Sequence, residues 1–228
     1  MTVRQVERLG EDALLLRLGD AIDPAINARV HALAARIAAR RPPWLHDLVP
    51  AYASLALFVD GGAFADGDDP LAEAERWLGD FADEETGEAK PSTRVVEIPV
   101  RYGGEDGPDL DAVAAQAGMP PDEVVALHAA GEYSVAMLGF APGFPYLLGL
   151  DPRLATPRLE TPRAKVPAGS VGIGGAQTGI YPRSGPGGWR LIGRTTTTLF
   201  DAARDPPAVL SPGDRVRFVV AGGTGNDR

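Results

Sequence analysis

Glycine and proline crowd together in one part of the chain, and this constrains its fold more than any other feature. Between Gly139 and Gly193, 20 of 55 residues are Gly or Pro. Long helices cannot form there, because Gly costs about 1 kcal/mol and Pro about 3 kcal/mol in a helix interior. Short strands joined by tight turns are expected instead, and such strands are typical of a barrel or a sandwich.

The first half of the chain predicts a small sandwich of sheet and helices. A helix is expected from Asp23-Pro24 to Arg40, since Asp can cap a helix and Pro is tolerated at its first position. Asp69-Pro70 starts a second helix in the same way. Four strands are expected around these helices, at residues 3–8, 12–18, 45–49 and 54–60. The order ββαββα favours an α+β, ferredoxin-like N-terminal domain.

The second half predicts a few short helices among many short strands. A strand at residues 94–100 and helices at 109–117 and 122–130 come first. Further strands are expected at residues 133–138, 170–174, 179–181, 189–198 and 214–220. The acidic stretch 83–90 is interpreted as a linker. The chain is therefore divided into a small α/β domain with its linker, residues 1–90, and a mainly β domain, residues 91–228.

Composition excludes several classes of protein. Of 228 residues, 44% are hydrophobic and 23% are charged, as in a folded soluble protein. No apolar run approaches the roughly 18 residues of a transmembrane helix, and the N-terminus lacks the pattern of a signal peptide. The chain has no cysteine, which excludes disulfides, thiolate nucleophiles and cysteine-based zinc sites. A cytoplasmic protein that does not bind membranes is expected.

The charge distribution favours a small anionic ligand over nucleic acid. A net charge of −9 argues against nucleic acid as the main partner. Residues 151–194, however, hold seven basic and two acidic residues, so this segment is net +5. A local positive field of this kind suits a small anion, unless other parts of the fold neutralise it.

The familiar nucleotide, hydrolase and metal motifs are missing from the sequence. There is no phosphate-binding P-loop and no G-x-S-x-G, and Gly172-Ile-Gly174 lacks the third glycine of a dinucleotide fingerprint. The three histidines, His31, His46 and His128, have no metal-binding spacing. Each is expected to be a surface or capping residue, and no metal site is predicted.

The candidate site lies in the Gly- and Pro-rich half. Unusual segments occur at residues 139–146, 156–158, 161–170, 177–182, 185–189 and 191–194. Gly and Pro fix the backbone and let a ligand approach closely, while Arg offers a planar fork for carboxylate or phosphate. Lys165 is notable because the chain has 20 Arg and two Lys. The alternative interpretation is a set of barrel turns with exposed cations.

A family resemblance rests on these segments and on others before them. The motifs that carry it are Val49–Leu55, Pro99-Val-Arg-Tyr-Gly-Gly, Gly107-Pro-Asp-Leu110, Leu127-His128, Gly139-Phe-Ala-Pro-Gly-Phe144, Val166-Pro-Ala-Gly-Ser170, Gln177-Thr-Gly-Ile-Tyr-Pro182 and Gly187–Arg194. Together they resemble the KipI / 5-oxoprolinase B-subunit (PxpB) family, also named allophanate hydrolase subunit 1 (carboxyltransferase domain, subdomains C and D). Two positions depart from the family pattern, Gly185 where Ser is expected and Thr196 where Pro is frequent.

The resemblance implies a cyclophilin-like β-barrel for the second half. It implies a direct heteromer with a KipA / PxpC-type subunit and a third subunit of the LamB/YcsF (PxpA) type. That assembly converts 5-oxoproline to glutamate with ATP, accompanied by Mg, as co-substrate. No cofactor is expected on this chain alone, which is expected to be inactive by itself. The same pair of folds is fused in the carboxyltransferase part of urea carboxylase.

Residue chemistry suggests roles within the region that the resemblance indicates. Phosphorylation of an unreactive lactam requires cations around the phosphates and the substrate carboxylate. The expected catalytic cations are Lys165, Arg163 and Arg194. The expected substrate-binding residues are Arg158, Gln177, Tyr181 and Phe144, with Gln177 and Tyr181 orienting the amide and the loop 139–144 shaping the pocket wall.

Three other functions stay open on the sequence. KipI-type proteins are linked to inhibition of a sensor histidine kinase, which needs a docking surface and no turnover. Prolyl isomerase activity follows from fold analogy alone, and fold does not imply function. An allophanate- or urea-linked role matches the older family name, but the chain lacks an amidase nucleophile segment and a biotin-carrier Met-Lys-Met.

Overall fold

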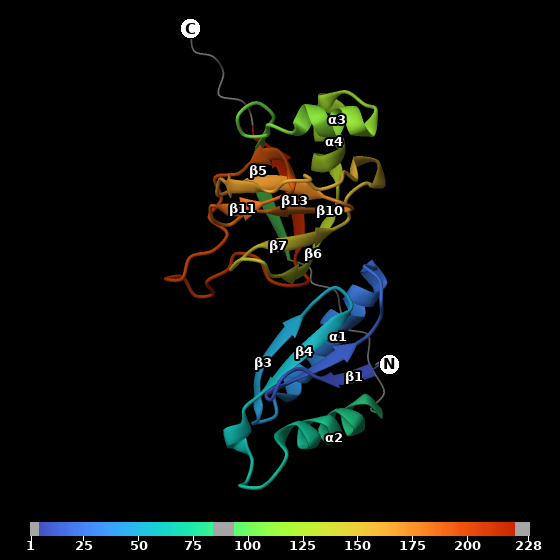
Figure 1. Ribbon diagram of the computed structural model, residues 1–228, viewed down its shortest axis with the longest axis vertical. Helices are drawn as coiled ribbons and strands as arrows, with labels where there is room; N and C mark the ends of the chain where they lie inside the picture. The colour runs from blue at the N-terminus through green and yellow to red at the C-terminus, as the bar shows by residue number, and fades with distance from the viewer. Residues whose placement is uncertain (1–4, 84–93, 222–228) are drawn as a thin grey trace. The chain divides into compact units, whose positions relative to one another are not determined.

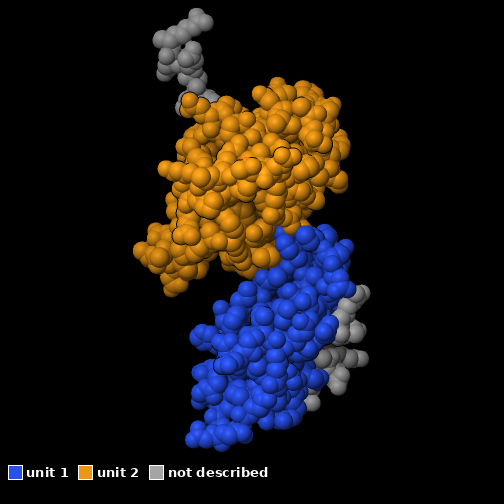
Figure 2. Space-filling view, viewed as in Figure 1, with its two compact units in different colours: residues 1–91 blue, residues 92–228 orange. Residues whose placement is uncertain are grey.

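The computed structural model of the chain describes residues 5–83 and 94–221. The chain forms two compact units, residues 1–91 and 92–228, which are coloured separately in Figure 2. Apart from Asp83, the predicted linker at residues 83–90 lies outside the described residues. Together the units give a mixed α/β fold that contains a closed seven-stranded barrel.

The first unit is a four-stranded antiparallel sheet with two helices. Its elements are β1 (Gln5–Arg8), β2 (Ala13–Arg17), α1 (Pro24–Arg40), β3 (Leu45–Pro50), β4 (Ser54–Val59), a short 3₁₀ helix η1 (Gly61–Ala63) and α2 (Pro70–Asp83). The strand order is β1-β2-β4-β3, and every neighbouring pair is antiparallel. The order of helices and strands is the one predicted from the sequence.

One face of this sheet carries the core of the first unit. Alternate residues of β4 are buried, as expected for a strand with one face packed and one exposed. Both helices place an apolar stripe on the same cluster. Asp23 caps α1, because its carboxylate accepts hydrogen bonds from the amides of Ala25 and Ile26 at 2.8 and 2.9 Å. The predicted start of this helix is thereby confirmed.

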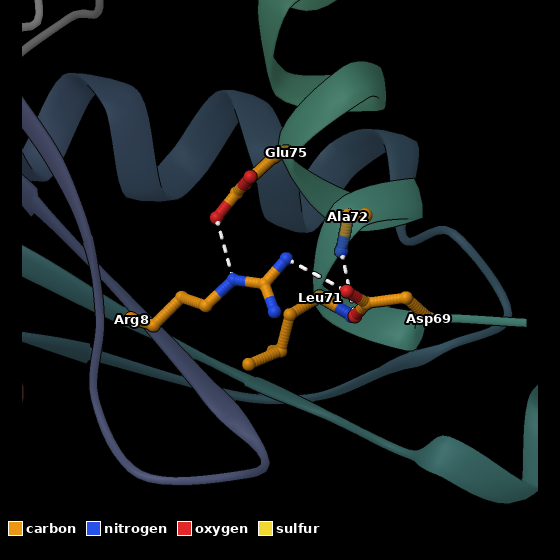
Figure 3. A network of polar contacts seen from close by, with 5 residues as sticks. All are labelled: Arg8, Asp69, Leu71, Ala72 and Glu75. Atoms are coloured by element: carbon orange, nitrogen blue, oxygen red, sulfur yellow. Dashed lines mark hydrogen bonds and ion pairs between the residues drawn. The ribbon is translucent and has the colours of Figure 1, made fainter.

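A small polar network fixes the start of α2 against β1 (Figure 3). The Asp69 carboxylate accepts hydrogen bonds from the amides of Leu71 and Ala72, both at 3.1 Å. Arg8 of β1 donates to Asp69 at 2.9 Å and to Glu75 at 3.2 Å. The backbone amide of Ala72 and the Arg8 guanidinium hold the pKa of Asp69 below its usual value. Since these side chains are exposed, the network orients the helix more than it stabilises the fold.

The second unit is built around the barrel (Figure 1). Its elements are β5 (Val95–Tyr102), α3 (Leu110–Ala117), α4 (Pro121–Ala130), β6 (Tyr133–Leu138), β7 (Pro145–Leu148), a 3₁₀ helix η2 (Pro152–Leu154), β8 (Arg163–Val166), β9 (Ser170–Gly174), β10 (Gln177–Ile180), β11 (Gly185–Gly187), β12 (Arg190–Arg194) and β13 (Arg215–Val220). The closed barrel runs β10-β7-β6-β13-β5-β12-β9. Strands β8 and β11 form a separate two-stranded sheet.

Three strands of this unit were not predicted. β7 begins at Pro145, a residue tolerated at the first position of a strand. β8 and β11 are short and pair only with each other, and β11 consists of Gly185-Pro-Gly187. The predicted strand 189–198 is too long, because β12 ends at Arg194. Strands of this length carry too little periodicity to be read from the sequence.

The barrel interior is filled with side chains, and His128 from the last turn of α4 packs against them. The prediction that His128 is a surface or capping residue is wrong. His128 is fully buried, and its ring stacks on Phe218 with the two ring centroids 4.5 Å apart. The Thr178 hydroxyl donates to the carbonyl of Gly172 at 3.0 Å, so it accepts from His128 Nε2 at 3.0 Å. His128 Nδ1 then accepts from the Tyr102 hydroxyl at 2.8 Å.

Burial lowers the pKa of His128 to about 3. The imidazole is therefore neutral at physiological pH, with its proton on Nε2. Its hydrogen-bonding capacity is fully used by the barrel, which makes it a residue of the core.

Within residues 5–83 and 94–221, none of the helices has both the length and the apolar character needed to cross a bilayer.

Candidate functional site

A pocket of about 160 Å³ in the second unit is the candidate binding site. We call it the aromatic pocket. It is lined by Phe140, Phe144, Tyr146, Arg158, Leu159, Pro162, Tyr181, Gly187, Gly188 and Trp189. An apolar cavity of roughly 150 Å³ is large enough for benzene, so the pocket suits a ligand of one small ring.

Trp189 packs against a patch of the barrel wall that is formed by three glycines of β9 and β10. Gly172 and Gly179 are directly opposed across β9 and β10, and Gly174 lies two residues further on the same face. A Cβ atom on Gly174 would lie 2.6 Å from the indole of Trp189. The opposite face of these strands points into the barrel core through residues such as Ile173. Glycine is thus required there to let the indole approach.

Phe144 is the centre of the ring cluster that forms the pocket wall. It is 2% exposed, and its ring centroid lies 4.9 Å from Tyr146, 5.2 Å from Tyr181 and 5.5 Å from Trp189. The last two pairs are edge-to-face, the arrangement that aromatic quadrupoles prefer. Phe140 joins the cluster from the pocket mouth, with its centroid 5.4 Å from that of Phe144.

Arg158 supplies the positive charge of the aromatic pocket. Its guanidinium carbon lies 5.7 Å from the ring centroid of Trp189, within the range of a cation–π contact. The side chain is exposed, and it forms no ion pair with any of the residues that the structure describes. Its planar fork is therefore available to a carboxylate or phosphate at the pocket.

Two phenols supply neutral hydrogen-bonding groups. Burial raises the pKa of Tyr181, although the backbone amide of Trp189 donates to its oxygen and opposes the rise. Burial likewise raises the pKa of Tyr146. Gly187 lets Tyr181 approach, because a Cβ atom there would lie 2.4 Å from the phenol oxygen. Both phenols stay protonated at neutral pH and can donate a hydrogen bond to a ligand oxygen.

Arg163 lies beside the aromatic pocket, with its charge engaged by Asp109. The guanidinium donates to the Asp109 carboxylate at 2.8 Å and to the carbonyl of Trp189 at 3.5 Å. The other oxygen of Asp109 accepts from the amide of Leu191 at 2.7 Å. The pair therefore joins β8 to β12 next to Trp189. In this arrangement Arg163 positions a wall of the pocket.

The other predicted residues lie outside the pocket lining. Arg194 pairs with Asp106 at 3.3 Å, and Asp106 also binds Arg101 at 2.7 Å. Gln177 is buried in β10. Lys165 is exposed on β8 and forms no ion pair within residues 5–83 and 94–221. Of the seven predicted site residues, the aromatic pocket brings together Phe144, Arg158 and Tyr181.

Sequence reasoning does not assign a site role to Trp189, Tyr146 or Asp109. Trp189 and Tyr146 lie in the candidate segments 185–189 and 139–146, and Asp109 lies in one of the family motifs, but none of the three receives a role of its own. The available signal for Trp189 is a large ring directly after Gly187-Gly188 in a Gly-rich segment. Asp109 gives no local signal, because its partner Arg163 lies 54 residues further along the chain.

The described part of the chain contains no group of three or more His, Asp or Glu side chains arranged to hold a metal ion.

Comparison with known proteins places the chain in a family. The family model for the carboxyltransferase domain, subdomain C and D, matches residues 4–210. Curated proteins named as the B subunit of 5-oxoprolinase match as well. The one from Bacillus subtilis (strain 168) is 45% identical over 96% of this chain and 94% of its own length. The chain belongs to the 5-oxoprolinase B-subunit family of carboxyltransferase C and D subdomains. The relative from Escherichia coli O157:H7 is also 45% identical, over 92% of this chain and 93% of its own.

Solved structures share the fold. The crystal structure of TTHA0988 is 41% identical over 92% of this chain, with a TM-score of 0.77, and this chain spans 40% of that one. PH0987 from Pyrococcus horikoshii is 44% identical over 95% of this chain and 97% of its own, with a TM-score of 0.55. Kluyveromyces lactis urea carboxylase matches at 20% identity and a TM-score of 0.73, over 95% of this chain and 22% of its own, which shows the fold alone.

Proposed function

We propose that this chain is a subunit of a 5-oxoprolinase that converts 5-oxoproline to glutamate with ATP, and that its aromatic pocket binds the lactam. The observation that carries the proposal is 45% identity to proteins named as the B subunit of 5-oxoprolinase over nearly their whole length. The pocket supports it, because a single-ring volume beside one guanidinium suits a small cyclic carboxylate.

The reaction needs activation because a five-membered lactam is an unreactive amide. Transfer of the γ-phosphoryl group of ATP to the lactam oxygen releases ADP and makes the carbonyl carbon more electrophilic. One water then adds to this carbon, and the ring C–N bond breaks. The product is an open-chain acyl phosphate whose former ring nitrogen is now an amine. A second water releases phosphate and leaves glutamate. The role proposed for this chain is to assist the phosphorylation step.

The residues of the aromatic pocket divide into three tasks in this proposal. Arg158 binds the substrate carboxylate through its planar fork. The Phe144 cluster packs against the ring carbons and excludes water from one side. Tyr181 donates a hydrogen bond toward the amide and orients it. The buried, protonated phenol described above supports this last role.

Phosphate binding is assigned to exposed cations of the second unit that form no ion pair with the described residues. Lys165 on β8 and Arg183 in the loop before β11 are exposed and form no ion pair within residues 5–83 and 94–221. Mg²⁺ would arrive with the phosphates of ATP. We keep Lys165 as the candidate catalytic cation, whereas the ion pairs of Arg163 and Arg194 support positioning roles for these two.

The active unit is proposed to be a heteromer. The relatives are each named as one subunit of 5-oxoprolinase, which supports further subunits in the assembly. We assign these to the KipA / PxpC type and to the LamB/YcsF (PxpA) type. In this proposal the chain is inactive alone. Its pocket offers binding groups for the substrate, and the water-activating groups come from another subunit.

The finer fold assignments are proposals too. The order β1-β2-β4-β3, with both helices on one face, supports a ferredoxin-like first unit whose chain starts at a different strand. The closed barrel with α3 and α4 packed against β12 and β13 supports a cyclophilin-like second unit.

The test is reconstitution of the complex. We expect purified complex of this chain with its KipA-type and LamB-type partners to release glutamate from 5-oxoproline only with ATP, and to lose this activity when this chain is omitted. A well-formed complex without turnover would contradict the proposal. Inhibition of a sensor histidine kinase by this chain would then identify the docking function that the sequence left open.

A further inference from the structure

Phe140 combines two properties that a folded protein rarely keeps together. Its side chain is 62% exposed, although Phe144 four residues later is buried. Its backbone has a φ of +66°, which L side chains rarely adopt. Among the described residues, Arg41 is the other non-glycine with a positive φ, and it lies at the C-terminal cap of α1, where this conformation is common. No helix end accounts for Phe140.

The loop holds this conformation through its own hydrogen bonds. The amide of Ala141 donates to the carbonyl of Gly139 at 2.7 Å, which makes Phe140 the centre of a γ-turn with positive φ, the more strained kind. The base of the loop closes where the amide of Gly139 donates to the carbonyl of Phe144 at 3.1 Å. Gly143 packs tightly behind it, since a Cβ atom there would lie 2.8 Å from Cβ of Phe200.

The fixed backbone places the Phe140 ring at the mouth of the aromatic pocket. The ring meets Phe144 at 72° and Tyr181 at 89°, with centroids 5.4 and 6.1 Å apart, so both pairs are T-shaped. It lines the same pocket as Arg158. An exposed apolar ring in a strained turn contributes little to folding, and such an outlier points to a function at the site it borders.

We propose that Phe140 is a specificity-determining residue, whose ring forms a preset outer wall over the ring of a small cyclic carboxylate held by Arg158. The inference rests on the proposed function, because it takes 5-oxoproline as that ligand. The strained turn is already formed in the free protein, so no free energy is needed to order the Phe140 wall when the ligand binds. Covering the ligand buries the exposed face of Phe140 as well.

The test compares three variants of Phe140 in the complete complex. Phe140→Ala and Phe140→Gly remove the ring and are expected to raise KM for 5-oxoproline about tenfold, with kcat changed less than about twofold. A tenfold change corresponds to losing roughly half of the apolar contact that a fully buried phenyl ring would make. Phe140→Tyr restores the wall and is expected to keep the wild-type KM. Val220→Ala, which shortens another exposed apolar side chain of the same unit, is the matched control and is expected to change neither constant.

Thermal stability separates this role from a structural one. Phe140→Gly is expected to melt at or above the wild-type temperature, because Gly adopts a positive φ freely. An active complex with unchanged KM in both Phe140→Ala and Phe140→Gly would overturn the inference and leave the proposed function standing. Loss of complex assembly by a variant that stays folded would also overturn it, since Phe140 would then be an anchor for the partner. Absence of turnover in the wild-type complex would remove the proposed function itself, and the inference with it.

Discussion

Replacement of His128 should change how the stability of the barrel depends on pH. His128 is fully buried and neutral, with a pKa of about 3 in the folded chain against 6.5 for an unperturbed histidine. Between these two pKa values, His128 is protonated in the unfolded chain and neutral in the folded chain. Because the folded pKa is depressed, the stabilisation is fully present above pH 6.5 and is lost as the pH falls toward 3.

The magnitude follows from this difference in pKa. The folded and unfolded pKa values differ by about 3.5, and at about 1.36 kcal/mol per pH unit this corresponds to about 5 kcal/mol over the whole range. Between pH 7.5 and 5.0 the same relation gives a loss of about 2 kcal/mol. Below pH 6 the contribution of this one residue approaches its limiting slope of about 1.4 kcal/mol per pH unit. Carboxylates also change stability in acid, but they do so equally in a variant at His128.

The assay is urea unfolding at pH 7.5 and 5.0, read on backbone amide signals of β9 and β10 so that the barrel is followed apart from the first unit. The His128→Gln variant is expected to be less stable at pH 7.5, because Tyr102 and Thr178 lose part of their hydrogen bonding. Its loss of stability on going to pH 5.0 should be about 2 kcal/mol smaller than that of the wild type.

The matched control is His46→Gln, since His46 is exposed on β3 of the first unit. It should leave the pH dependence of barrel unfolding unchanged. Equal pH dependence in wild type and His128→Gln, within about 0.5 kcal/mol, would refute the assignment of His128 as a buried neutral residue. Titration of its ring signals between pH 5 and 7 would refute it as well.

Three further substitutions test how the aromatic pocket is built and used. Lys165→Ala should leave the melting temperature within about 1 °C, because the side chain is exposed, yet abolish ATP-dependent turnover of the complex; full activity would remove Lys165 from the mechanism. Arg163→Ala should destabilise the barrel by about 2 kcal/mol in urea unfolding, because it leaves the buried Asp109 without its ion pair, and an unchanged midpoint would contradict that role. Gly174→Ala should lower the free energy of unfolding by about 2 kcal/mol and shift the fluorescence of Trp189, because the new methyl group overlaps the indole. A variant with wild-type stability and wild-type emission would contradict the close approach of Trp189 to Gly174.

The sequence was most informative where a signal is local. Asp23-Pro24 predicts the start of α1, and the apolar segment at residues 54–60 predicts β4, because both signals act over a few neighbouring residues. The Gly- and Pro-rich half was correctly predicted to lack long helices. β8 and β11 were missed, since a three- or four-residue strand is defined by its partner more than by its own pattern.

The candidate site was harder to predict because its parts meet only in the folded chain. Arg163 looked like a free anion-binding cation until the structure placed it against Asp109. Gly172, Gly174 and Gly179 lie in strands that the sequence predicts, but no local pattern shows that they form the surface that receives Trp189. His128 looked like a capping residue at the end of a helix, and burial in the barrel gives it a different role. No local pattern encodes these long-range contacts.

The most direct measurement of the central claim is the KM for 5-oxoproline of the complete complex with wild-type chain and with Arg158→Ala. Because Arg158 is the available guanidinium of the aromatic pocket, its removal should raise KM at least about tenfold while the complex still assembles. Arg215→Ala removes an exposed arginine of β13 and should leave KM unchanged. Equal KM values for wild type and Arg158→Ala in an active complex would show that the substrate carboxylate binds elsewhere and would contradict the account.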